Sequence, residues 1–205
     1  MTSVLQKMLR RIHAKGRGGV FVPRDFLDLG TRSAVDVALH RLTDRGVIRR
    51  LGQGVYDYPK QHDWFGTLSP DIDDVAQALA RSAQSTIQIS GAHAANALGL
   101  STQVPAKALY LTDGNNRSVK VGNYTLQFRR AAPKNLLAAG TAAGGVFQAL
   151  RYLGSDRVDD TITGKLSRIL DDRVKQDLAR LRQDAPAWMR TPIDRITAPA
   201  YQTAA

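Results

Sequence analysis

The chain has 205 residues, of which 43% are hydrophobic, so a folded protein with a core is expected rather than a disordered chain. Lysine and arginine number 29 against 18 acidic residues, and the resulting net charge of +11 favours a polyanionic partner, nucleic acid first. The sequence has no cysteine, no apolar run long enough for a membrane helix, no lipidation signal and no signal peptide, which together indicate a cytoplasmic protein without disulfides, thiolate metal sites or a membrane partner.

The first thirty residues predict two helices separated by a short strand. Residues 2–15 place five apolar side chains on one helical face, and the glycines of 16–19 end that helix. Residues 20–22 are apolar and β-prone. Pro23 suits the first turn of a second short helix, which Gly30 ends. The five side chains of the first apolar face are Val4, Leu5, Met8, Leu9 and Ile12.

A third helix and a β-hairpin follow. Thr31 is a good N-cap for a helix over residues 31–45, and Gly46 supplies its C-terminal stop. The buried stripe of this helix is expected to be Val35, Ala38, Leu39 and Leu42. Residues 47–58 form two β-prone runs joined around glycines, which predicts a hairpin. Three helices followed by a hairpin predict a winged helix-turn-helix domain over residues 1–62.

A second, mixed α+β domain is predicted over residues 67–195. After a joining segment at 59–70, helical patterns alternate with short strands, and Gly122-Asn123 is a two-residue hairpin signal within a small antiparallel sheet. From Leu136 onward the apolar spacing is helical again. The expected elements are helices over 72–84 and 92–98 and strands over 87–89, 109–111, 118–121 and 124–128. The last ten residues are expected to be a frayed tail.

The third helix is the candidate recognition helix, because the second helix of a helix-turn-helix enters the major groove. Its exposed face is predicted to contain Arg32, Ser33, Asp36, Val37, His40 and Arg41. The hairpin adds Arg49 and Arg50 near its base and Gln53 at its flexible tip, as a wing that reaches phosphates or the minor groove. The alternative interpretation is an ordinary solvated helix face.

A second basic stretch lies between Asp113 and Asp156, where the sequence has no acidic residue. It contains Arg117, Lys120, Arg129, Arg130, Lys134 and Arg151. These residues predict a second surface for nucleic acid or for an acidic partner. Because strands alternate faces, scattered surface cations are the alternative.

Catalytic and metal-binding patterns are weak. The sequence lacks a Walker A motif, a G-x-S-x-G motif and an H-E-x-x-H motif, and its four histidines have no metal-ligand spacing. The Asp pairs at 73–74, 159–160 and 171–172 lie where aspartate caps or solvates a helix. We therefore expect no enzyme, no metal and no cofactor.

Two blocks of the sequence resemble the AbiEi-type antitoxins of bacterial type IV toxin–antitoxin systems. The first comprises residues 20–26, 38–42 and 46–56, and the second, more specific block runs from Ile89 to Lys107 and continues through Tyr110–Gly114. The resemblance implies a winged helix that binds promoter inverted repeats and represses transcription, and a C-terminal domain that opposes a nucleotidyltransferase toxin. It assigns DNA contact to Arg32, Ser33, His40, Arg41, Arg49 and Arg50, and the positive C-terminal surface to Arg117, Lys120, Arg129 and Arg130.

The sequence therefore leaves two hypotheses for the function. One is a transcriptional autorepressor of antitoxin type that binds double-stranded DNA as a monomer and pairs on an inverted repeat, since no heptad seam is evident. The other is a protein-interaction module that binds a nucleotidyltransferase toxin or another partner, with the winged helix in a structural role.

Overall fold

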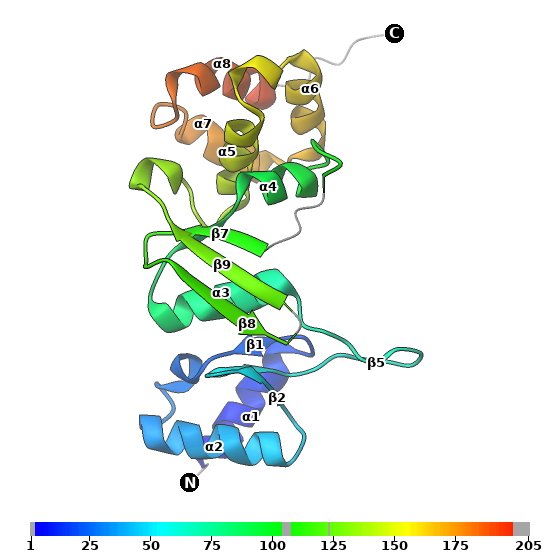
Figure 1. The fold of residues 1–205 in the computed structure, drawn as a ribbon, viewed down its shortest axis with the longest axis vertical. Helices are drawn as coiled ribbons and strands as arrows, with labels where there is room; N and C mark the ends of the chain where they lie inside the picture. Colours follow the sequence, from blue (N-terminus) through cyan, green and yellow to red (C-terminus); the bar gives the residue numbers. More distant parts are fainter. Residues whose placement is uncertain (1–2, 104–107, 123, 199–205) are drawn as a thin grey trace. The chain divides into compact units, whose positions relative to one another are not determined.

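The computed structural model describes residues 3–103, 108–122 and 124–198. The chain divides into two compact units, the first made of Met1–Ser85 with Ser118–Leu126 and the second of Thr86–Arg117 with Gln127–Ala205. In the described part, eight α-helices accompany three small sheets, which confirms the α+β class (Figure 1). The units differ from the expected ranges 1–62 and 67–195.

The first unit begins with α1 (Val4–Lys15), β1 (Val20–Phe21) and a single 3-10 turn, η1 (Pro23–Phe26). Ser3 caps α1 through a hydrogen bond that its Oγ accepts from the Gln6 N–H at 3.3 Å. Residues 23–30 were expected to form a helix, but the regular turn covers only Pro23–Phe26. Between Val22 and Leu29 the backbone hydrogen bonds join residues three apart, as in a 3-10 helix, and the bonds between residues four apart that define an α-helix do not form.

Helix α2 (Arg32–Asp44) follows η1. Thr31 caps it, because its Oγ1 accepts the Ala34 N–H at 3.3 Å, and Gly46 follows its end with φ of +65°. The expected stripe is buried, as Val35, Ala38, Leu39 and Leu42 are each 3% exposed or less. This stripe packs in one core with Met8, Ile12, Phe21, Phe26 and Ile48.

The predicted hairpin is present as β2 (Arg49–Gly52) and β3 (Val55–Asp57), which pair antiparallel. Strand β1 pairs antiparallel with the other edge of β3, so the strand order is β1-β3-β2. The register places Arg49 opposite Asp57 and shifts between Arg50 and Gly52. That irregularity bends the strand just before the turn at Gly54, whose φ is +69°.

The segment expected only to join two domains contains a second, small hairpin, β4 (Gln61–His62) with β5 (Gly66–Thr67). Helix α3 (Ile72–Ala83) follows, capped by Asp71, and buries Val75, Ala76 and Leu79. Ala83, expected to face inward, is exposed.

Helix α3 belongs to the first unit although it was expected in the second domain. Arg81 connects it to η1, with its Nε and Nη2 donating to the Asp25 carboxylate at 3.0 and 3.1 Å. The same Nη2 donates to the Val20 carbonyl oxygen at 3.2 Å. The Asp25 carboxylate also accepts the Val22 N–H at 3.0 Å, so one carboxylate links α3 to the turn that precedes α2.

The four-stranded sheet has the order β6-β7-β9-β8. Its strands are β6 (Ile87–Ile89), β7 (Ala108–Thr112), β8 (Arg117–Val121) and β9 (Tyr124–Arg130), with α4 (Gly91–Ala97) between the first two. β6 and β7 pair antiparallel, with Ile87 opposite Thr112. Of the predicted Gly122-Asn123 turn, Gly122 has φ of +56°, and Asn123 lies outside the described residues.

The rest of the second unit is helical. Its elements are η2 (Pro133–Asn135), α5 (Ala142–Leu153), η3 (Ser155–Arg157), α6 (Asp160–Ile169), α7 (Asp172–Arg180) and α8 (Ala187–Thr197). Helix α8 includes residues expected to fray, and Met189, Ile193 and Ile196 on one of its faces are fully buried in the core. Their spacing of four and three residues is helical, and burial outweighs the helix-breaking tendency of Pro192.

Candidate nucleic-acid interface

The outer face of α2 contains the predicted recognition residues. All six are exposed on the side of the helix away from its buried stripe: Arg32, Ser33, Asp36, Val37, His40 and Arg41. Val37, the aliphatic member of this set, is 47% exposed. The stripe fixes the rotation of the helix, and the structure therefore brings this predicted set onto one accessible face.

Part of the charge on this face is paired along the helix. Arg32 Nε donates to both carboxylate oxygens of Asp36, at 2.9 and 3.0 Å, and His40 Nε2 lies 3.4 Å from Asp44 Oδ2. These are exposed i,i+4 pairs, which stabilise weakly and open readily. Arg41 and Arg45 are exposed and have no ion pair with a carboxylate in the described part of the chain. The exposed arginines without a carboxylate partner therefore lie near the C-terminal end of α2.

The two hairpin arginines differ in their surroundings. Arg49 Nη2 lies 2.6 Å from Oδ2 of Asp57, a carboxylate only 1% exposed, and its Nε donates to Oδ1 at 3.1 Å. Arg49 Nη2 also donates to the Leu68 carbonyl oxygen at 3.0 Å. Hydrogen bonding to Asp57 raises the pKa of Arg49. Arg49 therefore holds the base of the hairpin together, a role that sequence analysis did not assign to it.

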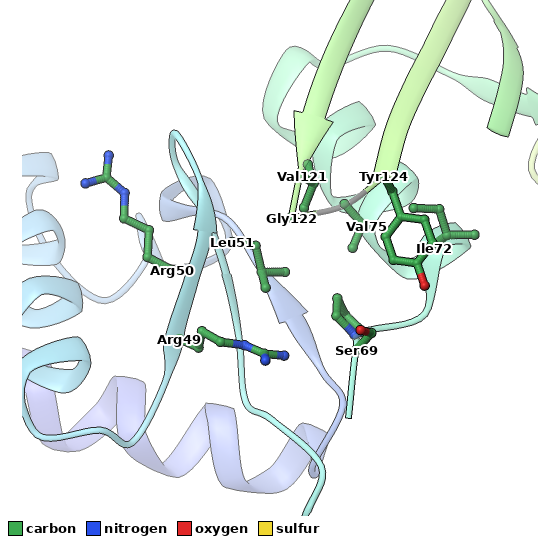
Figure 2. A pocket seen from close by; sticks show the side chains of 10 residues that line it. Arg49, Arg50, Leu51, Ser69, Ile72, Val75, Val121, Gly122 and Tyr124 are labelled. Atoms are coloured by element: carbon green, nitrogen blue, oxygen red, sulfur yellow. The ribbon is translucent and has the colours of Figure 1, made fainter. Parts of the chain in front are cut away.

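Arg50 and Gln53 remain open to solvent. Arg50 Nε donates only to the Gly52 carbonyl oxygen, at 3.3 Å, within its own turn. Figure 2 shows the Arg49 and Arg50 side chains pointing in different directions from the same strand, as strand alternation requires. Of the two predicted wing arginines, Arg50 is the one whose guanidinium is available to a phosphate.

A pocket of about 240 Å³ lies beside the hairpin within the first unit (Figure 2). Its lining is mainly apolar: Leu51 from β2, Pro70, Ile72 and Val75 around the start of α3, and Val121 and Tyr124 from β8 and β9. Arg49 also lines it, but its guanidinium is occupied by Asp57. The pocket offers apolar contacts and no arrangement of acid, base and nucleophile. Sequence analysis missed it because its walls are distant in the chain.

The cations near α1 are mostly engaged in the fold. Arg11 forms a two-point ion pair with Asp28 at 2.6 and 2.7 Å, and Arg17 lies over the Tyr58 ring at 4.8 Å. Lys15 Nζ donates to the Val20 carbonyl oxygen at 2.8 Å, and burial lowers the pKa of Lys15. Lys7 and Arg10 are exposed and remain available for phosphate contact.

The cations of the second basic stretch differ in their surroundings. Arg117 lies over the Phe128 ring at 4.5 Å, and Arg151 donates to the Lys134 carbonyl oxygen at 3.2 Å. Burial lowers the pKa of both arginines. Strand alternation puts the exposed neighbours Arg129 and Arg130 on opposite faces of β9. Lys120 and Lys134 are exposed.

Three of the aspartates in the acidic clusters of the sequence cap helices. Asp71, Asp159 and Asp171 each accept a backbone N–H at the start of a helix. Across residues 3–103, 108–122 and 124–198, no group of three or more potential ligands is placed to hold a metal ion. No helix among these residues is long and apolar enough to cross a membrane.

The fold and the site define an α+β protein whose first unit presents an exposed helix face and a hairpin with an exposed arginine, Arg50. Over residues 7–178 the chain matches a family described as "Family of unknown function (DUF6088)", and it belongs to this family. No curated protein matches the chain. The family description names neither an antitoxin nor a DNA-binding function, so the resemblance to AbiEi-type antitoxins stays a prediction.

Proposed function

We propose that the protein is a DNA-binding transcriptional repressor whose first unit is a winged helix-turn-helix. The order α1-β1-η1-α2-β2-β3, with the strand order β1-β3-β2, supports this assignment. In it, η1 and α2 form the helix-turn-helix, α2 is the recognition helix and β2–β3 is the wing. The observation that carries the proposal is the capped α2, whose polar face is exposed along its length.

Each part of this interface has a separate task. Arg32, Ser33 and Val37 lie in the N-terminal half of α2, from which a recognition helix contacts base edges. An arginine there pairs with guanine, and an aliphatic side chain contacts the thymine methyl group. Arg41, Arg45 and Arg50 have guanidinium groups that suit phosphates, which position the protein without reading sequence. DNA competes with Asp36 for Arg32, and the exposed pair costs little to open.

Binding to duplexes across a range of salt concentrations tests the proposal. We expect the protein to prefer a duplex of its own upstream region over a scrambled one, with an affinity that falls by about 0.9 log units per log unit of salt for each phosphate contact. Arg50→Ala should lower this slope by about 1. Arg168→Ala is the matched control, since Arg168 is also exposed and also donates to a local carbonyl, but in the second unit.

Three results would contradict parts of the proposal. An unchanged slope in Arg50→Ala would remove the wing assignment. Equal, salt-dependent binding to both duplexes would replace the repressor with a non-specific nucleic-acid binder. Absence of binding to either duplex would leave the second unit, as a module for a nucleotidyltransferase toxin or another protein, as the function to pursue. Co-purification with the product of the neighbouring gene tests that antitoxin role.

A further inference from the structure

The β4–β5 hairpin holds two aromatic side chains in solvent. Trp64 is 90% exposed and Phe65 is 79% exposed. Among the large hydrophobic residues that the structure describes, these two are the most exposed. Every residue from 60 to 67 is exposed, so nothing in the first unit covers this arm. In Figure 1 the ribbon labelled β5 extends away from the helices and the other strands of its own unit.

The tip has local contacts that keep the rings outward. The Trp64 N–H donates to His62 Nδ1 at 3.2 Å, and the His62 and Phe65 rings lie 4.9 Å apart. Across the base of the hairpin, Thr67 Oγ1 donates to Gln61 Oε1 at 3.0 Å. The histidine therefore supports Phe65 from one side and bonds to the backbone of Trp64. This arrangement presents both rings at the end of a narrow arm.

The size of the tip limits what it can bind. Two aromatic side chains bury about 300–500 Å² together, whereas a stable protein–protein interface buries about 1,200–2,000 Å². A second copy or another globular protein would need more surface than a hairpin with two-residue strands provides. Insertion at a base step, in contrast, needs only one or two apolar side chains.

An exposed lysine at the root of the arm is placed to meet a phosphate. Lys60 begins the arm, and Arg17 donates to the Pro59 carbonyl oxygen at 3.0 Å beside it. Asp63 is the only acid between Tyr58 and Pro70. A phosphate beside the base step would meet Lys60 at the root while the rings meet the bases.

We propose that Trp64 and Phe65 form an apolar wedge that inserts at a base step of the duplex bound by the first unit. This inference rests on the proposed DNA-binding function and adds a contact that the helix-turn-helix does not supply. Base–aromatic stacking is worth a five- to 150-fold change in affinity, by the usual effect of alanine substitution. No phosphate contact is lost with the ring, so the salt dependence should not change.

Trp64 also provides the probe, because the sequence contains only two tryptophans. In Trp188→Phe, Trp64 is the only indole, and its acrylamide quenching can be followed with and without the upstream duplex. We expect the duplex to lower the quenching constant several-fold. Trp64→Ala should weaken binding by about five- to 150-fold at every salt concentration with an unchanged slope, and Trp64→Phe should restore most of the loss.

The outcomes separate the wedge from the function on which it rests. If the duplex binds but acrylamide quenches Trp64 as strongly as in the free protein, the wedge proposal is wrong and the proposed repressor function is unaffected. Full duplex affinity in Trp64→Ala would have the same meaning. Absence of duplex binding in the unsubstituted protein would overturn both. Protection of Trp64 by anionic lipid vesicles, or by self-association at high protein concentration, without protection by DNA would also overturn the wedge. If Trp188→Phe does not fold, the difference in quenching between the unsubstituted protein and Trp64→Phe gives the same information.

Discussion

Arg49 and Arg50 are identical side chains at adjacent positions, and their surroundings give them opposite roles. Arg49 compensates the charge of a carboxylate that is almost fully buried, while Arg50 extends into solvent. A buried carboxylate without its partner is costly, because the low-dielectric interior cannot replace the lost solvation. The same substitution at the two positions should therefore affect stability at one and DNA affinity at the other.

Arg49→Ala should destabilise the protein by about 3 kcal/mol, since it leaves Asp57 buried and unpaired. Arg50→Ala should change the free energy of unfolding by less than about 0.5 kcal/mol. Urea unfolding followed by circular dichroism measures both. Equal stability of the two variants would show that the Asp57 pair does not hold the hairpin.

The Arg11–Asp28 pair should give the first unit a contribution to stability that depends on pH. Hydrogen bonding to Arg11 lowers the pKa of Asp28. A carboxylate with a lowered pKa in the folded state stabilises the protein above the unfolded value of about 3.9 and loses this contribution as the pH falls through the folded value. Asp28 is well exposed, so the effect is small.

We therefore expect Asp28→Asn to lower the urea midpoint at pH 7, and the difference from the unsubstituted protein to disappear in strong acid. Asp63→Asn is the control, since Asp63 has no ion pair within the described residues. A difference that stays constant from pH 7 into strong acid would mean that the loss in Asp28→Asn is not electrostatic.

At the scale of elements, helix α5 depends on one of two adjacent glycines. A Cβ on Gly144 would overlap the Ala138 carbonyl oxygen and lie 2.5 Å from Gln88 Oε1, whereas a Cβ on Gly145 would meet nothing within 4 Å. Gln88 itself is 3% exposed and accepts the Gly140 N–H at 2.9 Å. Close packing of α5 against this loop and β6 therefore requires glycine at position 144.

Gly144→Ala should destabilise the protein by about 1–3 kcal/mol through overpacking. Gly145→Ala should stabilise it by about 0.5–1 kcal/mol, because alanine is the better helix former and the site has room. Thermal unfolding measures both variants. Destabilisation by both would indicate a loss of helix geometry rather than a clash at one position.

The elements that the sequence predicted are those whose signals are local. Thr31 and Asp71 cap helices where expected, and the 3.6-residue spacing identified the buried face of α2, since caps and periodicity depend on neighbours within a few residues. The Arg49–Asp57 pair depends on strand register, and the pocket at Tyr124 depends on which distant segments meet. Neither is determined by a short window of sequence.

At the scale of the whole molecule, the proposed helix-turn-helix and the absence of a heptad seam from the sequence predict how the protein would assemble on DNA. We expect a monomer in solution and two copies on an inverted repeat whose half-sites lie about 10 base pairs, or a multiple of this, apart. Analytical ultracentrifugation with and without the duplex measures the stoichiometry. A half-site duplex is the control and should bind one copy. A stable dimer without DNA would contradict this expectation.

The first unit is discontinuous in the chain, because Ser118–Leu126 belongs to it and follows a long segment of the second unit. During synthesis, the elements up to α3 therefore leave the ribosome before the strands that supply Val121 and Tyr124 to the pocket. At about 5–20 residues per second, this interval lasts roughly 2–8 s. In the nascent protein, α2 is thus synthesised before the first unit is complete. For the same reason, a truncation after residue 62 or residue 85 does not isolate that unit, and deletion mapping by such fragments would confuse loss of binding with incomplete folding.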